Sequence, residues 1–443
     1  MERQATPASP VTSGGLPLDG VRIVDFTVVW AGPFASQILA EWGAEVIRVE
    51  STKYFQPSTR GTMAHPPKAL IDSGALRGYP DKEPGDRPWN RWAGFSVHSR
   101  NKLSMTVDLN TEDGQEALER LIRTSDGLIE NNAVASMDRV GVTWERLSKI
   151  NPELVMVRMP AFGLTGPYRN YRTFGNHMEA LVGHYSLFGY AGASPADSGL
   201  NIMADPAGGA AGAMAFMAGM LQRRRTGKGV QIEVATADGF ANYLGDYVLD
   251  YGMNGRLHEY RGNRDSVFAP QGVYPCVGDD RWVSITIGST DQWKALCGAM
   301  NRADLAGDAR YQEADGRRRF HDELDAEISA WTSGVDATEV MNSLQGLGVP
   351  AGVVMNEADA YGDPHLNARG YWEELEHPEA GTHRYPGVVW KAEETPNRLR
   401  RAAPRLGEDN EYVYRDLLRY TDDEYRRLEG LGHIGMDYDP SIP

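Results

Sequence analysis

VRIVDFTVVWAGPFASQILAEWGAEVIRVE, residues 21–50, decides the fold class of this chain. Its first six residues, 21–26, are rich in β-branched side chains and predict a strand, and residues 44–50 predict a second strand. Between them, residues 34–43 combine apolar positions at helical spacing with a closing glycine, which predicts a helix. A strand, a crossover helix and a second strand form a βαβ unit, so a mostly parallel sheet is expected.

The same alternation continues through the first half of the chain. Further strands are expected at 104–109, in DGLIEN at 126–131 and in LVMVRM at 154–159, with amphipathic helices between them. The sequence therefore predicts an α/β protein with a large, doubly wound, Rossmann-like domain. A dinucleotide site is disfavoured although Glu50 ends the second strand, because the first turn carries only Gly32 where the fingerprint needs several glycines.

Changes in composition divide the rest of the chain. The predicted segments are a disordered tail at 1–17, a large domain at 18–230, a linker at 231–265, a smaller α+β domain at 266–395, and a return to the large domain at 396–443. The tail has no apolar core that could serve as a signal peptide. The small domain is expected to open with two short strands in VYPCVGDDRWVSITIG.

Charge and cysteine content exclude several classes of protein. A formal net charge of −16 over 443 residues disfavours nucleic acid as a partner, since phosphate binding needs a positive field. The two cysteines, Cys276 and Cys297, predict neither a disulfide framework nor a metal cluster, and favour a cytoplasmic location. The uncharged run after Asp205 is too short for a bilayer span and predicts a packed helix, which Asp205 is expected to cap.

Several segments stand in a recognisable order and spacing. They are LDGVRIVDFT and WAGPFASQILAEWGAEVIRVE within 18–50, SRNKLSMTVDL at 99–109, IENNAVASMDRVGVTWERLSKINPELVMV at 129–157, GLTGPY at 163–168, and DPAGGAAGAMAFMAGMLQRRRTGKGVQIEVA at 205–235. Together they resemble the class III CoA-transferases, or CaiB/BaiF group, which includes formyl-CoA and carnitine CoA-transferases and α-methylacyl-CoA racemases. The resemblance implies two protomers threaded through one another like linked rings, with CoA or acyl-CoA bound on the large domain as substrate. No metal is expected.

The resemblance also implies positions for the CoA contacts. They are Val29, Trp30 and Ala31 in the first turn, Arg48 and Ser51 after the second strand, and Lys102, Asn131, Asn132 and Arg139. Cationic side chains and helix N-terminal N–H groups are what a pyrophosphate and a 3′-phosphate require. Asn132 replaces the aromatic or apolar residue common at that place, which leaves an adenine contact there open.

The family nucleophile has no counterpart at its expected place. In related transferases an aspartate carboxylate attacks the acyl-CoA thioester. Within GPYRNYRTFGNHMEALVGH, residues 166–184, the resemblance places that aspartate at Gly175, and the His-Asp pair of the racemases is replaced by Phe174-Gly175.

Three explanations stay open for this replacement. In the first, a paralogous subunit supplies the nucleophile, as in hetero-oligomers of the benzylsuccinate type. In the second, Glu179 is the nucleophile. In the third, the chain uses a different carboxylate, or acts as a CoA-ester lyase, hydratase-like enzyme or racemase with other acid–base groups, among which His177 and His184 share a helical face. Glu179 lies about 5.4 Å further along the predicted helix than the missing aspartate, so a structural or positioning role is expected for it.

The sequence is best interpreted as that of a CoA-transferase, which moves CoA between an acyl-CoA, such as succinyl-CoA, and a carboxylic acid. A homodimer or a hetero-oligomer with a paralogous subunit is expected, without nucleic acid or membrane partners. The alternative is a non-catalytic CoA-binding subunit. In the small domain, Arg261, Asn263 and Arg264 either meet an acyl carboxylate or form surface ion pairs.

Overall fold

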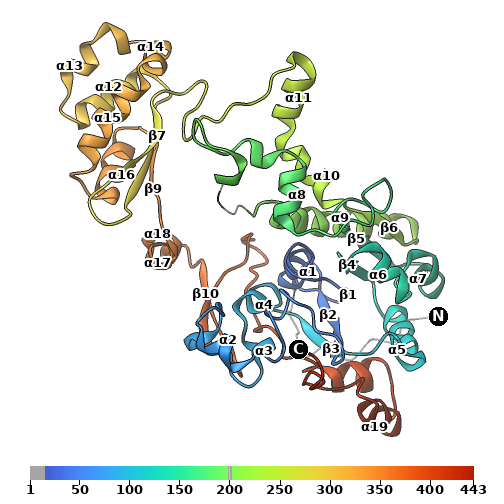
Figure 1. Cartoon of the computed structure of the whole chain (residues 1–443). Coiled ribbons are helices and arrows are strands. Elements are labelled where there is room, and N and C mark those ends of the chain that lie inside the picture. Colours follow the sequence, from blue (N-terminus) through green and yellow to red (C-terminus); the bar gives the residue numbers. More distant parts are fainter. Residues whose placement is uncertain (1–14, 198, 200–201) are drawn as a thin grey trace. The chain divides into compact units, whose positions relative to one another are not determined.

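The computed structural model describes residues 15–197, 199 and 202–443, and the chain divides into two compact units (Figure 1). The described residues of the first unit lie within 1–183, 200–253 and 368–443, and those of the second lie within 184–199 and 254–367. Most of the tail predicted at 1–17 lies outside the described residues. Of its last three residues, Leu16 is buried, and its N–H donates to Asp19 Oδ2 over 2.9 Å.

A six-stranded sheet forms the centre of the first unit, in the order β3-β2-β1-β4-β5-β6, and every neighbouring pair is parallel. The strands are β1 (Arg22–Asp25), β2 (Glu45–Glu50), β3 (Leu103–Thr106), β4 (Gly127–Glu130), β5 (Val155–Arg158) and β6 (Val230–Glu233). The predicted parallel α/β sheet is confirmed. Strand β6 lies where the linker 231–265 was expected, because it is a short, half-exposed edge strand of mixed polarity.

The helices of the first unit cover both faces of this sheet. They are α1 (Ala31–Glu41), α2 (Lys68–Asp72), α3 (Pro88–Arg91), α4 (Ala93–His98), α5 (Glu112–Arg123), α6 (Val134–Arg139), α7 (Trp144–Ile150), α8 (Gly175–Leu181), α9 (Ala204–Thr226), α10 (Thr236–Ala241), α11 (Gly245–Asn254), a π-helix (Tyr412–Leu417) and α19 (Asp422–Gly430). Alternate residues along β1 point to opposite cores: Ile23 packs with α1 and α9, whereas Val24 packs with α5 and the C-terminal helices. This alternation is the doubly wound arrangement that the sequence predicts.

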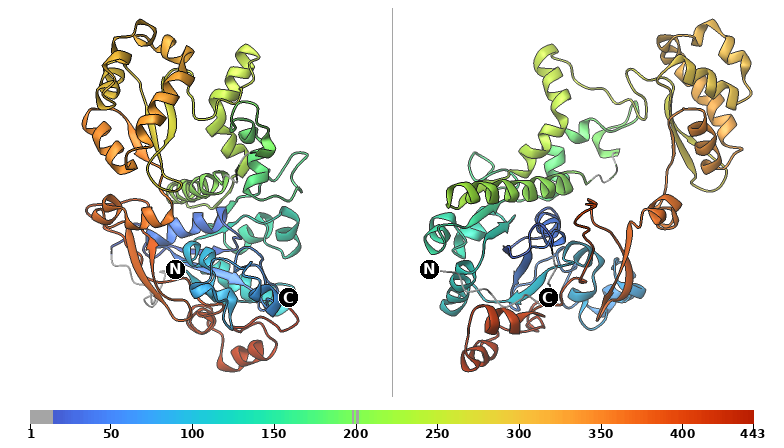
Figure 2. Two further views of the ribbon diagram at one scale, coloured as in Figure 1. Left: turned by 60° about the vertical axis from the view of Figure 1, so that its left-hand side comes forward. Right: turned by 180° about the vertical axis from the view of Figure 1, so that it is seen from behind.

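Helix α9 lies against α1 because its small residues allow close approach (Figure 2). A Cβ on Gly209 would lie 2.7 Å from the Ala31 carbonyl oxygen, and one on Gly212 would lie 2.5 Å from Met159 Sδ. The small-residue run is therefore helix-packing surface. Among the described residues, no helix has the length and apolar character needed to cross a membrane.

The second unit is built around an antiparallel sheet of three strands, β7 (Gln271–Pro275), β8 (Trp282–Thr286) and β9 (Ala351–Val353). Its helices are α12 (Thr290–Ala299), α13 (Ala303–Gly307), α14 (Ala314–Arg319), α15 (His321–Thr332), α16 (Ala337–Gly346), α17 (Glu357–Gly362) and α18 (Pro364–Ala368). The hairpin β10 (Trp372–His377) and β11 (Gly381–Pro386) belongs to the first unit, although the sequence placed it in the small domain. Its core residue Leu375 packs with Leu399, which explains that membership.

Candidate functional site

A cavity of about 680 Å³ opens at the carboxyl ends of the central strands of the first unit. Its walls come from residues 28–31 after β1, 54 and 56–57 after β2, 131–134, 136 and 139 after β4, 159–161 after β5, 169 and 171–178 before and within α8, and Ile202, Asp205 and Thr236. Strands β1 and β4 are neighbours in the sheet but are separated in sequence by β2 and β3. Open α/β sheets bind ligands at such a switch point.

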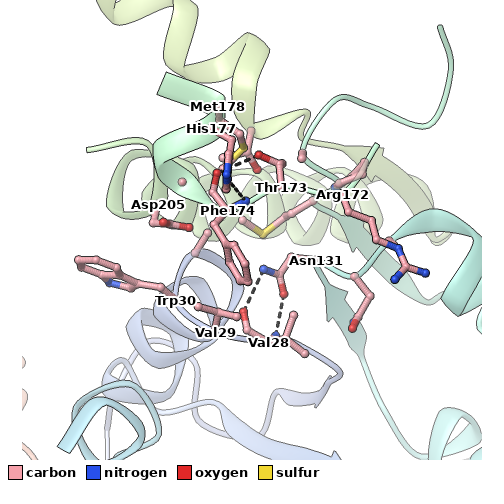
Figure 3. Close-up of a pocket in the computed structure, with 18 of the residues that line it drawn as sticks. Val28, Val29, Trp30, Asn131, Arg172, Thr173, Phe174, His177, Met178 and Asp205 are labelled. Carbon is pink, nitrogen blue, oxygen red and sulfur yellow. Dashed lines mark hydrogen bonds between the residues drawn. The ribbon is translucent and has the colours of Figure 1, made fainter. Parts of the chain in front are cut away.

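The turn after β1 forms the floor of this cavity and is fixed by Asn131. The Val28 N–H donates to Asn131 Oδ1 over 2.8 Å, and Asn131 Nδ2 donates to the Val28 carbonyl over 3.1 Å (Figure 3). Val29 has a positive φ of 60°, which is unfavourable for a β-branched residue. Helix α1 begins two residues later, at Ala31, and the Ala31 N–H donates to Asp205 in the cavity wall.

Six of the predicted CoA contacts line this cavity together. They are Val29, Trp30, Ala31, Asn131, Asn132 and Arg139. Asn132 uses its side-chain amide internally, because Nδ2 donates to the Phe26 carbonyl over 2.6 Å. This bond explains why a polar residue stands at that place: it ties the turn after β4 to the end of β1.

Arg48 and Lys102 do not line the cavity, although the resemblance implied that both contact CoA. Each side chain is fully buried. Arg48 donates to the Thr27 carbonyl and lies 3.1 Å from a Glu50 oxygen, whereas Lys102 Nζ lies 3.0 Å from Asp25 Oδ2. A phosphate group cannot reach cations enclosed in this way, so their expected contacts are not available in this structure.

These two cations instead neutralise carboxylates beneath the site. Burial alone would raise the pKa of Asp25, but the charges of Lys102 and Arg48 outweigh it and lower that pKa. Burial lowers the pKa of Lys102 to about 8, against the opposing attraction of Asp25. The resulting network holds the ends of β1 and β2 in register, so these residues support the cavity rather than line it.

The carboxylate of Asp205 occupies the space beside Gly175. A Cβ built on Gly175 would overlap Asp205 Oδ2 and lie 3.0 Å from its Cγ. Asp205 is the second residue of α9, lines the cavity and accepts a hydrogen bond from the Ala31 N–H. Figure 3 shows its carboxylate directed toward the segment that carries Phe174, with Arg172 on the opposite side of the cavity.

Glu179 has a different environment from Asp205. It is fully buried, and its Oε1 accepts the Met203 N–H over 2.6 Å and the Ala204 N–H over 3.0 Å. These N–H groups belong to the start of α9, so Glu179 does the capping that the sequence assigned to Asp205. The predicted cap role of Asp205 is therefore wrong.

The two histidines near this segment do not share a helical face. Helix α8 ends at Leu181, and His184 starts a separate turn that belongs to the second unit. His177 lines the cavity, and its Nδ1 accepts the Phe174 N–H over 3.1 Å. This bond fixes the start of α8 beside Gly175.

In the second unit, the arginines predicted near an acyl group line a smaller cavity of about 430 Å³. Arg264 Nη2 lies 2.5 Å from an Asp322 oxygen and 2.6 Å from an Asp325 oxygen. The surface ion-pair alternative therefore describes Arg264. Arg261 and Asn263 also line this cavity.

The raised pKa of Asp205 predicts a measurable effect on the free energy of unfolding. Burial and the charge of Glu179 raise its pKa to about 6, against the lowering by the Ala31 N–H. Because this folded-state pKa exceeds that of the unfolded chain, the ionised group destabilises the native state above pH 6, and stability is regained as the pH falls toward 4. We expect Asp205→Asn to raise the free energy of unfolding by about 1–3 kcal/mol at pH 7.5.

Urea unfolding of both proteins at pH 7.5 and pH 4 checks this expectation. The difference should shrink at the lower pH, because both side chains are then largely uncharged. An equal stability of the two proteins at pH 7.5 would contradict the raised pKa of Asp205.

Comparison with known proteins agrees with this geometry. Residues 18–410 match the sequence model of CoA-transferase family III. The chain is 31% identical to succinyl-CoA–D-citramalate CoA-transferase of Chloroflexus aurantiacus, over 93% of this chain and 97% of that protein. It is also 31% identical to the beta subunit of succinyl-CoA–L-malate CoA-transferase of the same organism, over 94% and 98% of the two chains.

Solved structures give the same result. The crystal structure of a CaiB/BaiF family protein from Brucella suis superimposes with a TM-score of 0.78 at 27% identity, covering 91% of this chain and 99% of that chain. The family match spans most of the sequence, including every segment that carried the resemblance. The chain therefore belongs to CoA-transferase family III.

Proposed function

We propose that this chain transfers CoA between an acyl-CoA thioester and a free carboxylic acid, and that the cavity at the ends of β1 and β4 holds the thioester. The observation that carries the proposal is the carboxylate of Asp205 lining a cavity at the switch point of the sheet. Family membership supports CoA as the group transferred. The two relatives named above use succinyl-CoA, which supports a succinyl donor here.

The rim of the cavity suits the phosphates of CoA. Arg139, Arg169 and Arg172 line it and are exposed, in a chain whose net charge is −16. Trp30 and Ala31 at the N-terminus of α1 line the same cavity, and a helix N-terminus favours negative charge. This local concentration of donors supports binding of the pyrophosphate and 3′-phosphate groups.

Acyl exchange tests the proposed function directly. The purified chain is incubated with succinyl-CoA and a panel of dicarboxylic acids that includes D-citramalate and L-malate, and the CoA esters are separated by chromatography. We expect a new CoA ester together with an equal amount of free succinate. Hydrolysis to free CoA without a new ester would contradict transferase activity.

Arg139→Ala is expected to weaken CoA binding by about 1.5–3 kcal/mol, because a charge-assisted phosphate contact is lost. Titration calorimetry with CoA measures the affinity. Arg123→Ala is the matched control, since Arg123 is an exposed arginine at the end of α5 that does not line the cavity. Equal affinity of the two variants would place Arg139 outside the binding site.

Exposed apolar side chains on α9 and α11 support the expected assembly of two protomers. Met214, Met217 and Leu221 are 72%, 41% and 49% exposed and lie on one side of α9. On α11, Val248 and Tyr251 are 60% and 57% exposed. Apolar surface of this kind is unusual on a monomer, so we propose that a second protomer covers it, as in the linked-ring dimer. Light scattering during gel filtration measures the assembly.

The second candidate function is a CoA-binding subunit that depends on a paralogous chain for its nucleophile. The glycine at position 175 favours it, as do relatives named as alpha and beta subunits of one transferase. A subunit of this kind would bind CoA alone and exchange acyl groups only when the paralogous chain is added.

A further inference from the structure

We propose that Asp205 is the catalytic carboxylate of this chain, presented from α9 into the space left open by Gly175. The inference rests on the proposed CoA transfer and assigns its nucleophile to this chain rather than to a partner. The starting observation is spatial: a Cβ at position 175 and the carboxylate of Asp205 would compete for one place. The absence of a side chain at position 175 is what allows Asp205 to lie there.

The carboxylate of Asp205 does not cap its own helix, α9. Glu179 accepts the first N–H groups of α9, so Asp205 is not needed as the cap. Among ion pairs between described residues, none involves Asp205. The Ala31 N–H at the start of α1 donates to it, which orients the carboxylate without neutralising it.

This environment suits a nucleophile. Asp205 is partly buried in the cavity wall, and its pKa is raised to about 6 by burial, with Glu179 adding to that effect. The group is therefore ionised at neutral pH yet more basic than an exposed aspartate, and higher basicity favours nucleophilic attack. Its buried acidic neighbour is already engaged by backbone N–H groups of Met203 and Ala204.

The chemistry balances with Asp205 in this role. Its carboxylate oxygen bonds to the thioester carbonyl carbon, and the carbon–sulfur bond breaks. CoA departs as the thiolate, and the acyl group remains on Asp205 as a mixed anhydride. The thiolate then attacks the carbonyl of Asp205, which releases the donor acid as its carboxylate and leaves an aspartyl-CoA thioester. An acceptor carboxylate repeats the two steps in reverse order, which restores the Asp205 carboxylate and yields the new CoA ester.

Asp205→Asn separates this role from simple support of the site. We expect acyl exchange to fall by about a thousandfold or more, while the affinity for CoA changes less than about threefold. Asp238→Asn is the matched control, because Asp238 is an exposed aspartate on α10 of the same unit that does not line the cavity. That control should keep the rate of the unaltered protein.

Trapping identifies the reacting residue. The protein is treated with succinyl-CoA and hydroxylamine, digested and mapped by mass spectrometry, with and without any copurifying chain. A hydroxamate on the peptide that contains Asp205, absent from Asp205→Asn, is the expected result. A hydroxamate on Glu179 or on a copurifying chain, with transfer intact, would overturn the assignment to Asp205 but leave CoA transfer standing.

Moving the aspartate from position 205 to position 175 distinguishes loss of the nucleophile from misfolding. Asp205→Gly should abolish exchange, and Gly175→Asp added to Asp205→Gly should recover a measurable part of it, because the two side chains share one space. Circular dichroism checks the fold of each variant. Full activity of Asp205→Gly would overturn the assignment, whereas no exchange by the unaltered protein with any donor or partner would overturn the proposed function itself.

Discussion

Gly175→Ala is expected to lower the rate of CoA transfer by about a hundredfold while leaving the free energy of unfolding nearly unchanged. The added methyl group would overlap Asp205 Oδ2, so the carboxylate must rotate away. A displacement of about 1 Å at a reacting group is enough for a loss of this size. The backbone itself accepts alanine, because Gly175 lies at the first position of α8 and is absent from the positive-φ residues.

The small change in stability distinguishes this effect from unfolding. Replacing glycine by alanine at a compatible backbone conformation stabilises the native state by about 0.4–1 kcal/mol, which offsets the cost of moving one flexible side chain. Gly239→Ala is the control: Gly239 lies in α10 with open space around the added Cβ. Steady-state rates and urea midpoints are measured for both. A Gly175→Ala protein with normal turnover would show that the position of Asp205 does not matter.

Local pattern was sufficient for most of the fold. The βαβ unit at 21–50 is a run of buried β-branched residues, a helix with small and apolar residues, and a second buried strand, and all three are present. Strand β6 was missed because none of its residues, Val230–Glu233, is fully buried, so neither composition nor alternation marks it. Its pairing with β5 exists only in the tertiary structure.

The candidate site was less predictable, because the roles of its charged residues depend on contacts with residues far away in the sequence. Arg48 and Lys102 resemble phosphate ligands in the sequence, yet each pairs with a buried carboxylate. Asp205 precedes a proline at a helix start, a pattern typical of a cap. Only the approach of α8 to α9 shows that Glu179 performs the capping and that Asp205 faces Gly175.

Glu50→Gln is expected to lower the free energy of unfolding by about 3–5 kcal/mol. Glu50 lies at the end of β2. It accepts hydrogen bonds from Arg60 Nε and Nη2, each over 2.6 Å, and from the Ser104 hydroxyl over 2.9 Å. Arg48 Nε lies 3.1 Å from the same carboxylate. Glutamine keeps the shape but removes the charge, so Arg60 loses its carboxylate partner and Arg48 keeps only Asp25, 4.0 Å away.

The pH dependence of stability identifies this carboxylate as the cause. Burial alone would raise the pKa of Glu50, but Arg60 and Arg48 outweigh it and lower the pKa to about 2. A depressed folded-state pKa means that the stabilisation is complete above about pH 4.5 and is lost as the pH falls toward 2. Urea unfolding between pH 7 and 3 should therefore show a falling stability for the unaltered protein and a flatter profile for Glu50→Gln.

An exposed ion pair on α5 is the control that shows whether the effect of Glu50→Gln depends on burial. Glu116 and Arg120 lie one turn apart on α5 with side chains 53% and 31% exposed, so water and salt already screen their attraction. Glu116→Gln is expected to cost less than about 0.5 kcal/mol, because removing an exposed charge strands no buried partner. If Glu50→Gln cost as little as Glu116→Gln, the buried network would not be holding β2 and the loop that carries Arg60 together. The cavity would then need another source of its rigidity, since the turn after β2 forms part of its wall.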